Sequence, residues 1–442
     1  MSEKETERIL DLARARFDAA EVYEESGETV NVRFENNNLK QVQTRQRRGV
    51  GLRVIQDGRI GFASTTDLRR PEKLIEMAAA SAEFGDEARF EFPSQPADAP
   101  SVGLWDENME DVSAEAMSDM GREALAMSRE ADDEYLFSSS ISRSLSRQRV
   151  LNTAGLDLAY RSTSMSSWVE VQEVREDGLL DIWEQKSWGR PFDSIADLAE
   201  ETLRKMRQAS TIVQARLETM PMIFVPKALG NLFSPVEVAI SGKHVHKGSS
   251  VLQGRIGEQI LDERLTVTDD PTVDFAPGSC PADDEGLPAR RQHLFEAGVL
   301  RTYLADLQTA GLLGIEPTAH GFRGYSSRPS PSTTNTVIAA GDTPLDEMVG
   351  GLGRGFIVDQ TLGSGQSNTL AGEFSVNVSL GFLVEEGRIV GRVKDCMVAG
   401  NVYKVLNRVE AIGSEQQWIG SACAPPLMVG GLKLAVQGND VD

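Results

Sequence analysis

Residues 48–63 read Arg-Gly-Val-Gly-Leu-Arg-Val-Ile-Gln-Asp-Gly-Arg-Ile-Gly-Phe-Ala and carry the clearest indication of fold in the first half of the chain. Apolar residues occupy every second position from 50 to 54, which is the period of a half-buried strand. Asp57-Gly58 is a residue pair typical of a tight hairpin turn, and the alternation resumes at 60–62. The stretch therefore predicts two antiparallel strands joined by a turn.

Outward from this hairpin, two periodicities divide the first half of the chain into helices and strands. Apolar residues at helical spacing predict helices over 2–17, from Pro71 onward, over 113–131 and over 195–217. Alternating residues predict further strands over 30–34, 137–150 and 156–174. We therefore expect residues 1–217 to form an α+β domain with an antiparallel sheet.

Residues 218–442 are expected to form a second domain, predominantly antiparallel β and barrel-like, with helices. A short apolar strand at 222–225 runs through Pro226 into a helix whose apolar residues form one continuous stripe. Pro235 lies inside that pattern, so the helix is expected to kink or restart there. The stripe consists of Leu229, Leu232, Phe233, Val236 and Ile240.

The net charge of the chain argues against some classes of binding partner. The chain has 45 Lys+Arg against 67 Asp+Glu, a formal net charge of −22. So acidic a protein repels phosphate backbones and anionic lipids, which argues against nucleic acid and membrane surfaces as partners. The charged start of the chain has no apolar segment of the kind found in signal peptides, and we expect a cytoplasmic location.

The histidines offer little for a metal site. The chain has four, and none belongs to a His-Glu-x-x-His or His-Glu-x-x-x-His motif. His244 and His246 would share one face of a strand, where two imidazoles can hold a metal. However, no third His or Cys lies nearby, and the charges of Lys243 and Lys247 would disfavour a cation. We interpret this pair as ordinary surface or hydrogen-bonding histidines.

The acidic run Asp283-Asp284-Glu285-Gly286 is open to two interpretations. Three carboxylates could hold a metal or the amine of a peptide. An acidic turn that opens a strand explains the same residues, and we prefer it. Nucleophilic catalysis has no support, because the chain has no Gly-x-Ser-x-Gly elbow and no base beside Cys396 or Cys423.

A set of short motifs nevertheless follows a recognisable order along the chain. In the second half these are Lys247-Gly248-Ser249-Ser250, Asp283-Asp284-Glu285-Gly286, Glu296-Ala297-Gly298-Val299-Leu300, Thr334-Asn335-Thr336, Gly372-Glu373-Phe374-Ser375 and Ala399-Gly400-Asn401; in the first half they are Arg48-Gly49-Val50-Gly51 and Asp57-Gly58-Arg59-Ile60. The ordered set resembles the TldD/PmbA family over about residues 20–435.

This resemblance implies a heterodimer of two similar subunits. TldD-type subunits carry His-Glu-x-x-x-His on a helix at a fixed distance before the Lys-Gly-Ser-Ser segment. The corresponding positions here are Phe233, Ser234 and Val238, none of which can act as ligand or base. Cys423 is likewise a poor match to the cysteine that completes the TldD site. The chain therefore resembles the PmbA/TldE subunit, with zinc expected in the TldD-like partner and no cofactor in this chain.

Three hypotheses for function remain open. In the first, the chain is a non-catalytic subunit that completes the substrate chamber and stabilises its partner, and it could form a homodimer when isolated. A second has an autonomous hydrolase using His244, His246 and Asp283 or Asp284, and a third has a peptide-binding scaffold unrelated to proteolysis. An extended peptide could be bound by strand addition. The candidate peptide-binding residues are Ser249, Ser250, Asp283, Asp284, Glu285 and Gly286.

Overall fold

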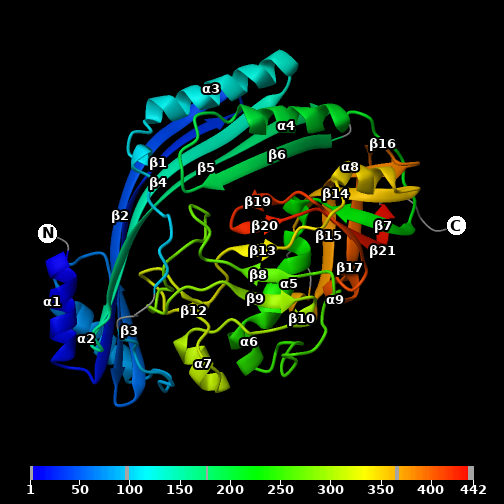
Figure 1. Ribbon diagram of the computed structural model, residues 1–442. Coiled ribbons are helices and arrows are strands. Elements are labelled where there is room, and N and C mark those ends of the chain that lie inside the picture. Colours follow the sequence, from blue (N-terminus) through cyan, green and yellow to red (C-terminus); the bar gives the residue numbers. More distant parts are fainter. Residues whose placement is uncertain (1–2, 95–98, 176–177, 364–367, 437–442) are drawn as a thin grey trace.

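The first half of the chain is built on one long antiparallel sheet. The computed structural model describes residues 3–94, 99–175, 178–363 and 368–436. Six strands follow one another in the order β3–β2–β1–β4–β5–β6, and the sheet arches over the C-terminal half (Figure 1). The strands are β1 (Ala19–Glu35), β2 (Asn38–Gln56), β3 (Arg59–Thr65), β4 (Leu136–Asn152), β5 (Asp157–Arg175) and β6 (Gly178–Trp188).

The predicted hairpin is confirmed. Gln56 pairs with Arg59 across the turn, and the alternating residues Val50, Leu52 and Val54 are fully buried. The turn residues Asp57 and Gly58 have φ values of 51° and 74°, which an Asp-Gly pair adopts at low cost.

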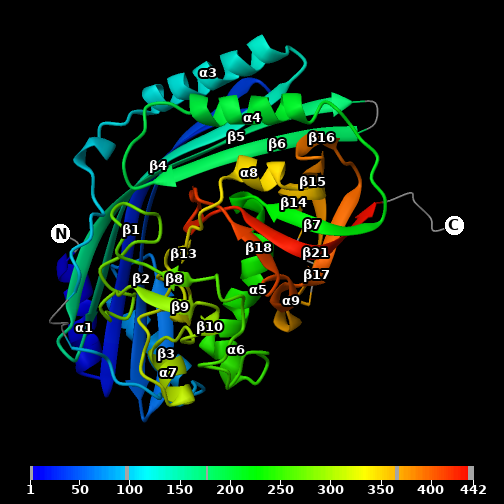
Figure 2. The same cartoon turned by 45° about the vertical axis from the view of Figure 1, so that its right-hand side comes forward.

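Helices cover one face of the sheet in two groups. Near one end, α1 (Glu3–Arg14) and α2 (Pro71–Ala82) share a hydrophobic cluster with β1, β2 and β3. Toward the other end, α3 (Ala114–Ala131) and α4 (Ala196–Gln208) lie on the outer side of the arch (Figures 1 and 2). Their apolar residues pack against alternate residues of β1, such as Val30, Val32 and Phe34.

The prediction for α4 was too long. The helix ends at Gln208, nine residues before the expected end at 217. The chain beyond it contains the β-branched run Thr211-Ile212-Val213, which disfavours helix. Its backbone bonds to the end of β16 (Arg388–Arg392) instead: Val213 N donates to Arg392 O at 2.9 Å, and Arg392 N donates to Thr211 O at 2.8 Å.

The C-terminal half contains a closed barrel, as the sequence predicts. The ring runs β14–β7–β21–β17–β15 and returns to β14, and all of its pairings are antiparallel except that of β14 with β7. The strands are β7 (Glu218–Phe224), β14 (Arg354–Leu362), β15 (Glu373–Glu385), β17 (Cys396–Asn401) and β21 (Leu427–Val436), while β16 and β18 (Val409–Ile412) pair outside the ring.

A second, smaller sheet and short helices complete this half. The sheet has the order β10–β9–β8–β13–β20–β19. Its strands are β8 (Val267–Asp269), β9 (Gln292–Glu296), β10 (Val299–Leu300), β13 (Thr336–Ile338), β19 (Gln417–Ile419) and β20 (Ala422–Ala424). Other elements are the pair β11 (Gly321–Phe322) and β12 (Ser330–Pro331), and the helices α5 (Gly230–Ile240), α6 (Gly242–His246), α7 (Leu307–Leu313), α8 (Leu345–Gly350) and α9 (Val402–Val405), with 3₁₀ turns η1 (Glu107–Met109), η2 (Pro226–Ala228) and η3 (Thr369–Ala371).

The α+β class is therefore confirmed in both halves. The division at 217/218 into two domains stays a prediction, because the hydrophobic cluster beneath α3 and α4 continues into β14 and β15. Ile357 and Phe382 of the barrel belong to the same cluster as Ile182 of the sheet.

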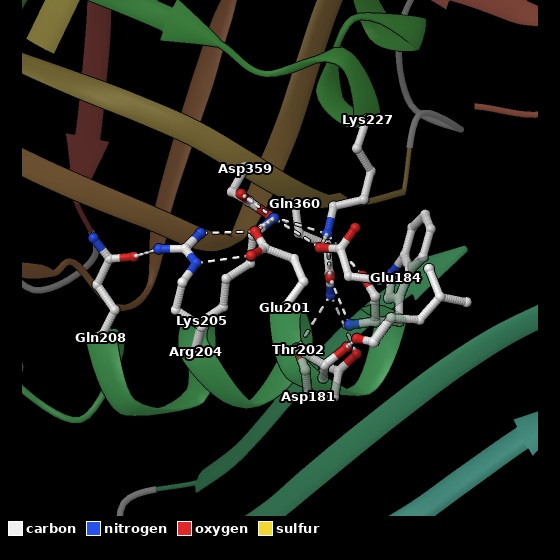
Figure 3. Close-up of polar contacts among 12 residues, drawn as sticks. Asp181, Glu184, Glu201, Thr202, Arg204, Lys205, Gln208, Lys227, Asp359 and Gln360 are labelled. Atoms are coloured by element: carbon white, nitrogen blue, oxygen red, sulfur yellow. Dashed lines mark hydrogen bonds and ion pairs between the residues drawn. The ribbon is translucent and has the colours of Figure 1, made fainter. Parts of the chain in front are cut away.

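Four buried charges join the sheet to the barrel (Figure 3). Lys205 Nζ of α4 lies 2.7 Å from Glu184 Oε1 of β6 and 2.8 Å from Asp359 Oδ2 of β14. Lys227 Nζ lies 2.9 Å from Glu184 Oε1 and 3.0 Å from Asp359 Oδ1. Burial by itself would raise the pKa of Asp359, but the two ammonium groups lower it. Two cations thus balance two anions in this cluster.

Removing one charge should unbalance the cluster. Lys205→Met should lower the free energy of unfolding by about 3–5 kcal/mol, because two buried carboxylates would then share one ammonium. The neighbouring Arg204 pairs with Glu201 on the surface, where its side chain is 54% exposed. Arg204→Met should therefore cost about 1 kcal/mol or less. Chemical denaturation measures both, and equal losses would contradict this account of the interface.

Candidate functional site

Helix α5 carries Phe233, Ser234 and Val238, the positions that the resemblance to the TldD/PmbA family matches to a zinc motif. Its apolar stripe is buried as predicted, and Pro235 lies within one helix, without a break. Phe233 is 6% exposed and belongs to the cluster that contains the barrel residues Phe224 and Phe374. Val238 is half-buried and Ser234 is exposed. Because the side chains of Phe233 and Val238 contain only carbon and hydrogen, this face packs and cannot bind a metal.

One carboxylate on α5 was missed in the sequence. Glu237 lies one turn after Phe233, and this i, i+4 spacing was the available signal. Burial raises its pKa, and Thr336 Oγ of β13 donates to its Oε1 at 3.1 Å. Cys423 lies on the neighbouring strand β20, opposite Val337, and is buried. Glu237 is thus held by a hydroxyl from the small sheet.

The prediction of a strand at His244 and His246 is wrong. Both lie on the short helix α6, so two residues of separation turns their side chains to different sides. Gly242 N bonds to Leu304 O, and Val245 N bonds back to Ser241 O, which starts a helical turn. His244 Nδ1 lies 3.3 Å from Ser249 Oγ, whereas His246 is exposed at a cavity wall.

The turn predicted at 283–286 is confirmed and is buried, but it does not lead directly into a strand. The next strand, β9, begins at Gln292. Asp283 accepts three backbone hydrogen bonds, from the N–H groups of residues 285, 287 and 321. Gly286 has a φ of +86°, and a Cβ there would lie 2.3 Å from the side chain of Leu156. The turn is therefore fitted against the N-terminal sheet.

Glu285 and Asp284 connect this turn to the strands of the sheet. Arg53 Nη1 of β2 donates to Glu285 Oε1 at 2.6 Å, and Arg53 also pairs with Glu21 of β1 at 3.0 Å. Arg323 lies 2.6 Å from Glu21 Oε1, and its backbone N–H donates to Asp284 Oδ2. Burial raises the pKa of Asp284 to about 6, although the N–H and the charge of Arg323 oppose the shift.

The candidate peptide-binding residues are thus engaged within the chain. Ser250 Oγ donates to Ala239 O at 2.5 Å, and Ser249 Oγ donates to His244 O at 3.2 Å. Ser249 is the one polar side chain of the set that is half-exposed, since Ser250, Asp283, Asp284 and Glu285 are all buried. A direct peptide contact by the buried members would require these bonds to break.

The described part of the chain contains neither a cluster of metal ligands nor an activated thiol. No three His, Cys, Asp or Glu side chains there converge on a point that could hold a metal ion. All three cysteines are buried and unpaired. Burial raises the pKa of each thiol, that of Cys396 to about 12, which suppresses the nucleophilic thiolate.

One edge of the long sheet is open. β1 pairs with β2 from residue 38 onward, whereas β3 pairs with β2 only from Val50 to Gln56. Among the described residues, no further strand pairs with the outer side of 38–48. This edge segment carries exposed apolar residues, Leu39 and Val42, and four basic residues but no carboxylate. An exposed strand edge of this kind can accept an added strand.

A polar groove of about 470 Å³ lies beside the open edge. It occupies the sheet face opposite α3, because the residues of β1 that line it alternate with those packed on that helix. Asn31 Nδ2 donates to Ser140 Oγ and Ser142 Oγ, both at 2.8 Å. The lining residues are Thr29, Asn31, Arg33, Gln41, Gln43, Arg45, Ser140, Ser142 and Trp168.

The arched sheet, the barrel and the α5 helix define a known class of protein. Residues 20–82 match the family model described as PmbA/TldA metallopeptidase domain 1, residues 107–209 match the central domain, and residues 217–436 match the C-terminal domain. The chain belongs to the PmbA/TldD metallopeptidase family.

Two particular members of the family are similar over nearly the whole chain, and a third is similar over half of it. The crystal structure of TldE from Thermococcus kodakarensis superposes with a TM-score of 0.90 at 25% identity, covering 98% of this chain and 100% of that one. The metalloprotease PmbA of Escherichia coli O157:H7 is 26% identical over 97% of this chain and 96% of its own length. A metalloprotease TldD homologue of Haemophilus influenzae is 29% identical, over 50% of this chain and 46% of its own.

A helix that crosses a membrane requires a certain length and composition. Among the residues that the structure describes, no helix combines the length and the apolar character needed to cross a membrane.

The packing of α5 makes a direct prediction about stability. Phe233→Asp should lower the free energy of unfolding by roughly 4 kcal/mol or more, because a buried cavity and an unpaired charge are created together. Ser234→Asp, at the exposed neighbouring position, and His244→Ala should change it little. Melting temperatures compare the three variants. A Phe233→Asp protein that melts with the other two would show that this face is not packed.

Asp284 should make stability depend on pH. Its folded pKa of about 6 exceeds the unfolded value of 3.8, so the folded protein holds the proton more tightly. The resulting stabilisation is complete below the unfolded pKa and is lost as pH rises through the folded pKa, a change of about 3 kcal/mol.

Asp284→Asn keeps an acceptor oxygen for the Arg323 N–H but cannot titrate. The free energy of unfolding of the wild type minus that of the variant should therefore fall by about 2–3 kcal/mol between about pH 4 and pH 7. A difference that stays constant over this range would contradict a raised pKa at Asp284.

Proposed function

We propose that this chain is the non-catalytic, PmbA/TldE-type subunit of a heterodimeric TldD–TldE zinc metallopeptidase that cleaves unfolded or modified peptides. The observation that carries the proposal is the chemistry of α5: Phe233 is buried against the barrel where a catalytic subunit would present a zinc ligand. The zinc and the general base are then supplied by a partner with the His-Glu-x-x-x-His motif.

The extent of the similarities supports the same subunit type. The match to the metalloprotease PmbA and the superposition on TldE each cover nearly the full length of both proteins. The match to the TldD homologue of Haemophilus influenzae covers only half of this chain. A cytoplasmic location is part of the proposal.

In this assembly, the chain contributes a surface to the peptide substrate. The edge segment at 38–48 offers backbone N–H and C=O groups to an extended chain, which binds peptides with little dependence on their sequence. The groove beside it offers hydroxyl and amide side chains together with Trp168. A substrate strand added at this edge would place alternate side chains over that groove.

An autonomous hydrolase is a weaker explanation of the same structure. It would need His244 and His246 to act together, but α6 directs them to different sides. It would also need Asp283 or Asp284 as a ligand or base, and both carboxylates are committed to backbone donors inside the protein.

The proposal is tested by reconstitution. This chain and its cognate His-Glu-x-x-x-His subunit should each be assayed alone and together on an unstructured peptide, with and without a chelator. Cleavage that the chelator abolishes should require both subunits, because one supplies the metal and the other completes the peptide site.

Matched substitutions in the two subunits sharpen the assay. A Glu→Gln change in the partner's motif should abolish cleavage in the mixture, because it removes the base that activates water. Ser234→Ala, at the corresponding position of this chain, should leave the rate unchanged. Cleavage by the pure chain in the presence of chelator would overturn the assignment.

A further inference from the structure

A second cavity, of about 710 Å³, lies where the two halves of the chain meet. From the N-terminal half its lining includes Arg53, Ile60 and residues of the segment 86–89; from the C-terminal half it includes residues of α6, α7 and the segment 328–329. A cavity of this size accommodates a small molecule or a short stretch of peptide. The cavity is separate from the polar groove at the open edge of the sheet, with which it shares no lining residue.

The wall formed by α6 is basic. Lys243, His246 and Lys247 all line the cavity, and their i, i+3, i+4 spacing places them on one side of the helical turn. Arg328 and Arg89 also line it. Such a gathering of cations runs against the overall composition, in which the net charge is −22.

Arg328 and Arg89 each form an ion pair with a carboxylate, whereas Lys243 and Lys247 form none in the described structure. Arg328 Nη1 lies 3.1 Å from Asp86 and Arg89 Nη2 lies 2.7 Å from Glu87. Within the described structure, no carboxylate oxygen lies within 4.0 Å of Nζ of Lys243 or Lys247. Lys243 Nζ donates instead to neutral oxygens, Ser330 Oγ at 2.8 Å and Pro329 O at 3.4 Å.

The third acidic residue of the lining, Asp306, is used elsewhere. Asp306 Oδ1 accepts the backbone N–H of Thr309 at 2.6 Å and thereby caps α7. Burial lowers the pKa of Lys243. Asp306 and Glu285 oppose the shift, but the charges of Arg328 and Lys247 lower the pKa further. An ammonium in this position is therefore short of negative charge.

The basic wall is held rigidly. Gly242 N donates to Leu304 O at 2.8 Å, and a Cβ at Gly242 would lie 2.6 Å from Thr309 Cγ2. This close contact fixes α6 against α7, so the backbone that carries the lysines is in place before any ligand arrives. Preorganisation of this kind reduces the entropy lost on binding.

We propose that this cavity is an anion-binding site, in which Lys243 and Lys247, with His246 beside them, hold a carboxylate or phosphate group of a small molecule or peptide. Charge-assisted hydrogen bonds from two ammonium groups to one anion supply the binding energy. The inference does not rest on the proposed catalytic partnership, because it concerns the isolated chain.

Binding to the isolated chain tests the proposal. Calorimetric titrations at constant ionic strength should use inorganic phosphate, and separately a short unstructured peptide with a free C-terminal carboxylate beside the same peptide as its C-terminal amide. At least one anionic probe should bind saturably. Lys243→Gln/Lys247→Gln should weaken that binding roughly tenfold or more, the loss expected from charge-assisted hydrogen bonds.

A charge-matched control separates the site from the general field of the protein. Lys4→Gln/Lys404→Gln removes the same charge from exposed positions that do not line the cavity, and it should leave binding unchanged. Phosphate binding alone would identify a phosphate ligand, and preference for the free carboxylate over the amide would identify a peptide terminus. Absence of saturable binding for both anions, or an equal loss in the control pair, would overturn the proposal.

Discussion

The arrangement of the two halves depends on the buried guanidinium of Arg53, which needs carboxylate partners. A fully buried cation must be compensated, and Glu21 of the sheet and Glu285 of the C-terminal half share that role. A second balanced cluster, around Lys205 and Asp359, fixes the barrel beneath α4. Separating either cluster would leave a buried charge without its partner, so both clusters oppose a shift of the arched sheet relative to the C-terminal half. The cavity lined by Arg53 is a consequence of that placement.

One face of a helix can hold a metal site or pack into a hydrophobic core, but not both. In this chain the stripe that contains Phe233 lies in the largest hydrophobic cluster, and the carboxylate on α5, Glu237, is bonded to Thr336. In the proposed assembly, the role of this subunit requires its shape and the strand edge that contacts the peptide. The open segment of β2 fits that role, because strand addition needs an exposed backbone and no reactive group.

The sequence predicts the local elements well and the buried polar contacts poorly. Alternation and turn residues locate the 57–58 hairpin and the serine-rich strands, since strand period and turn preference are local properties. The five-residue helix α6 is too short for a periodic pattern, and it was mistaken for a strand. The burial of Glu285 depends on Arg53, 232 residues away, and no local pattern records such a partner. Glu237 could be placed one turn after Phe233 on the predicted helix, but its burial could not be predicted, because its partner Thr336 lies 99 residues away.

The most direct test of the central claim is the zinc content of the native complex. The chain should be isolated from its own cells under mild conditions together with whatever His-Glu-x-x-x-His protein accompanies it, and zinc should be measured per chain before and after the subunits are separated. The account predicts one zinc for each pair of subunits, retained by the partner and absent from this chain. Two zinc ions per pair, or one zinc that stays with this chain after separation, would contradict it.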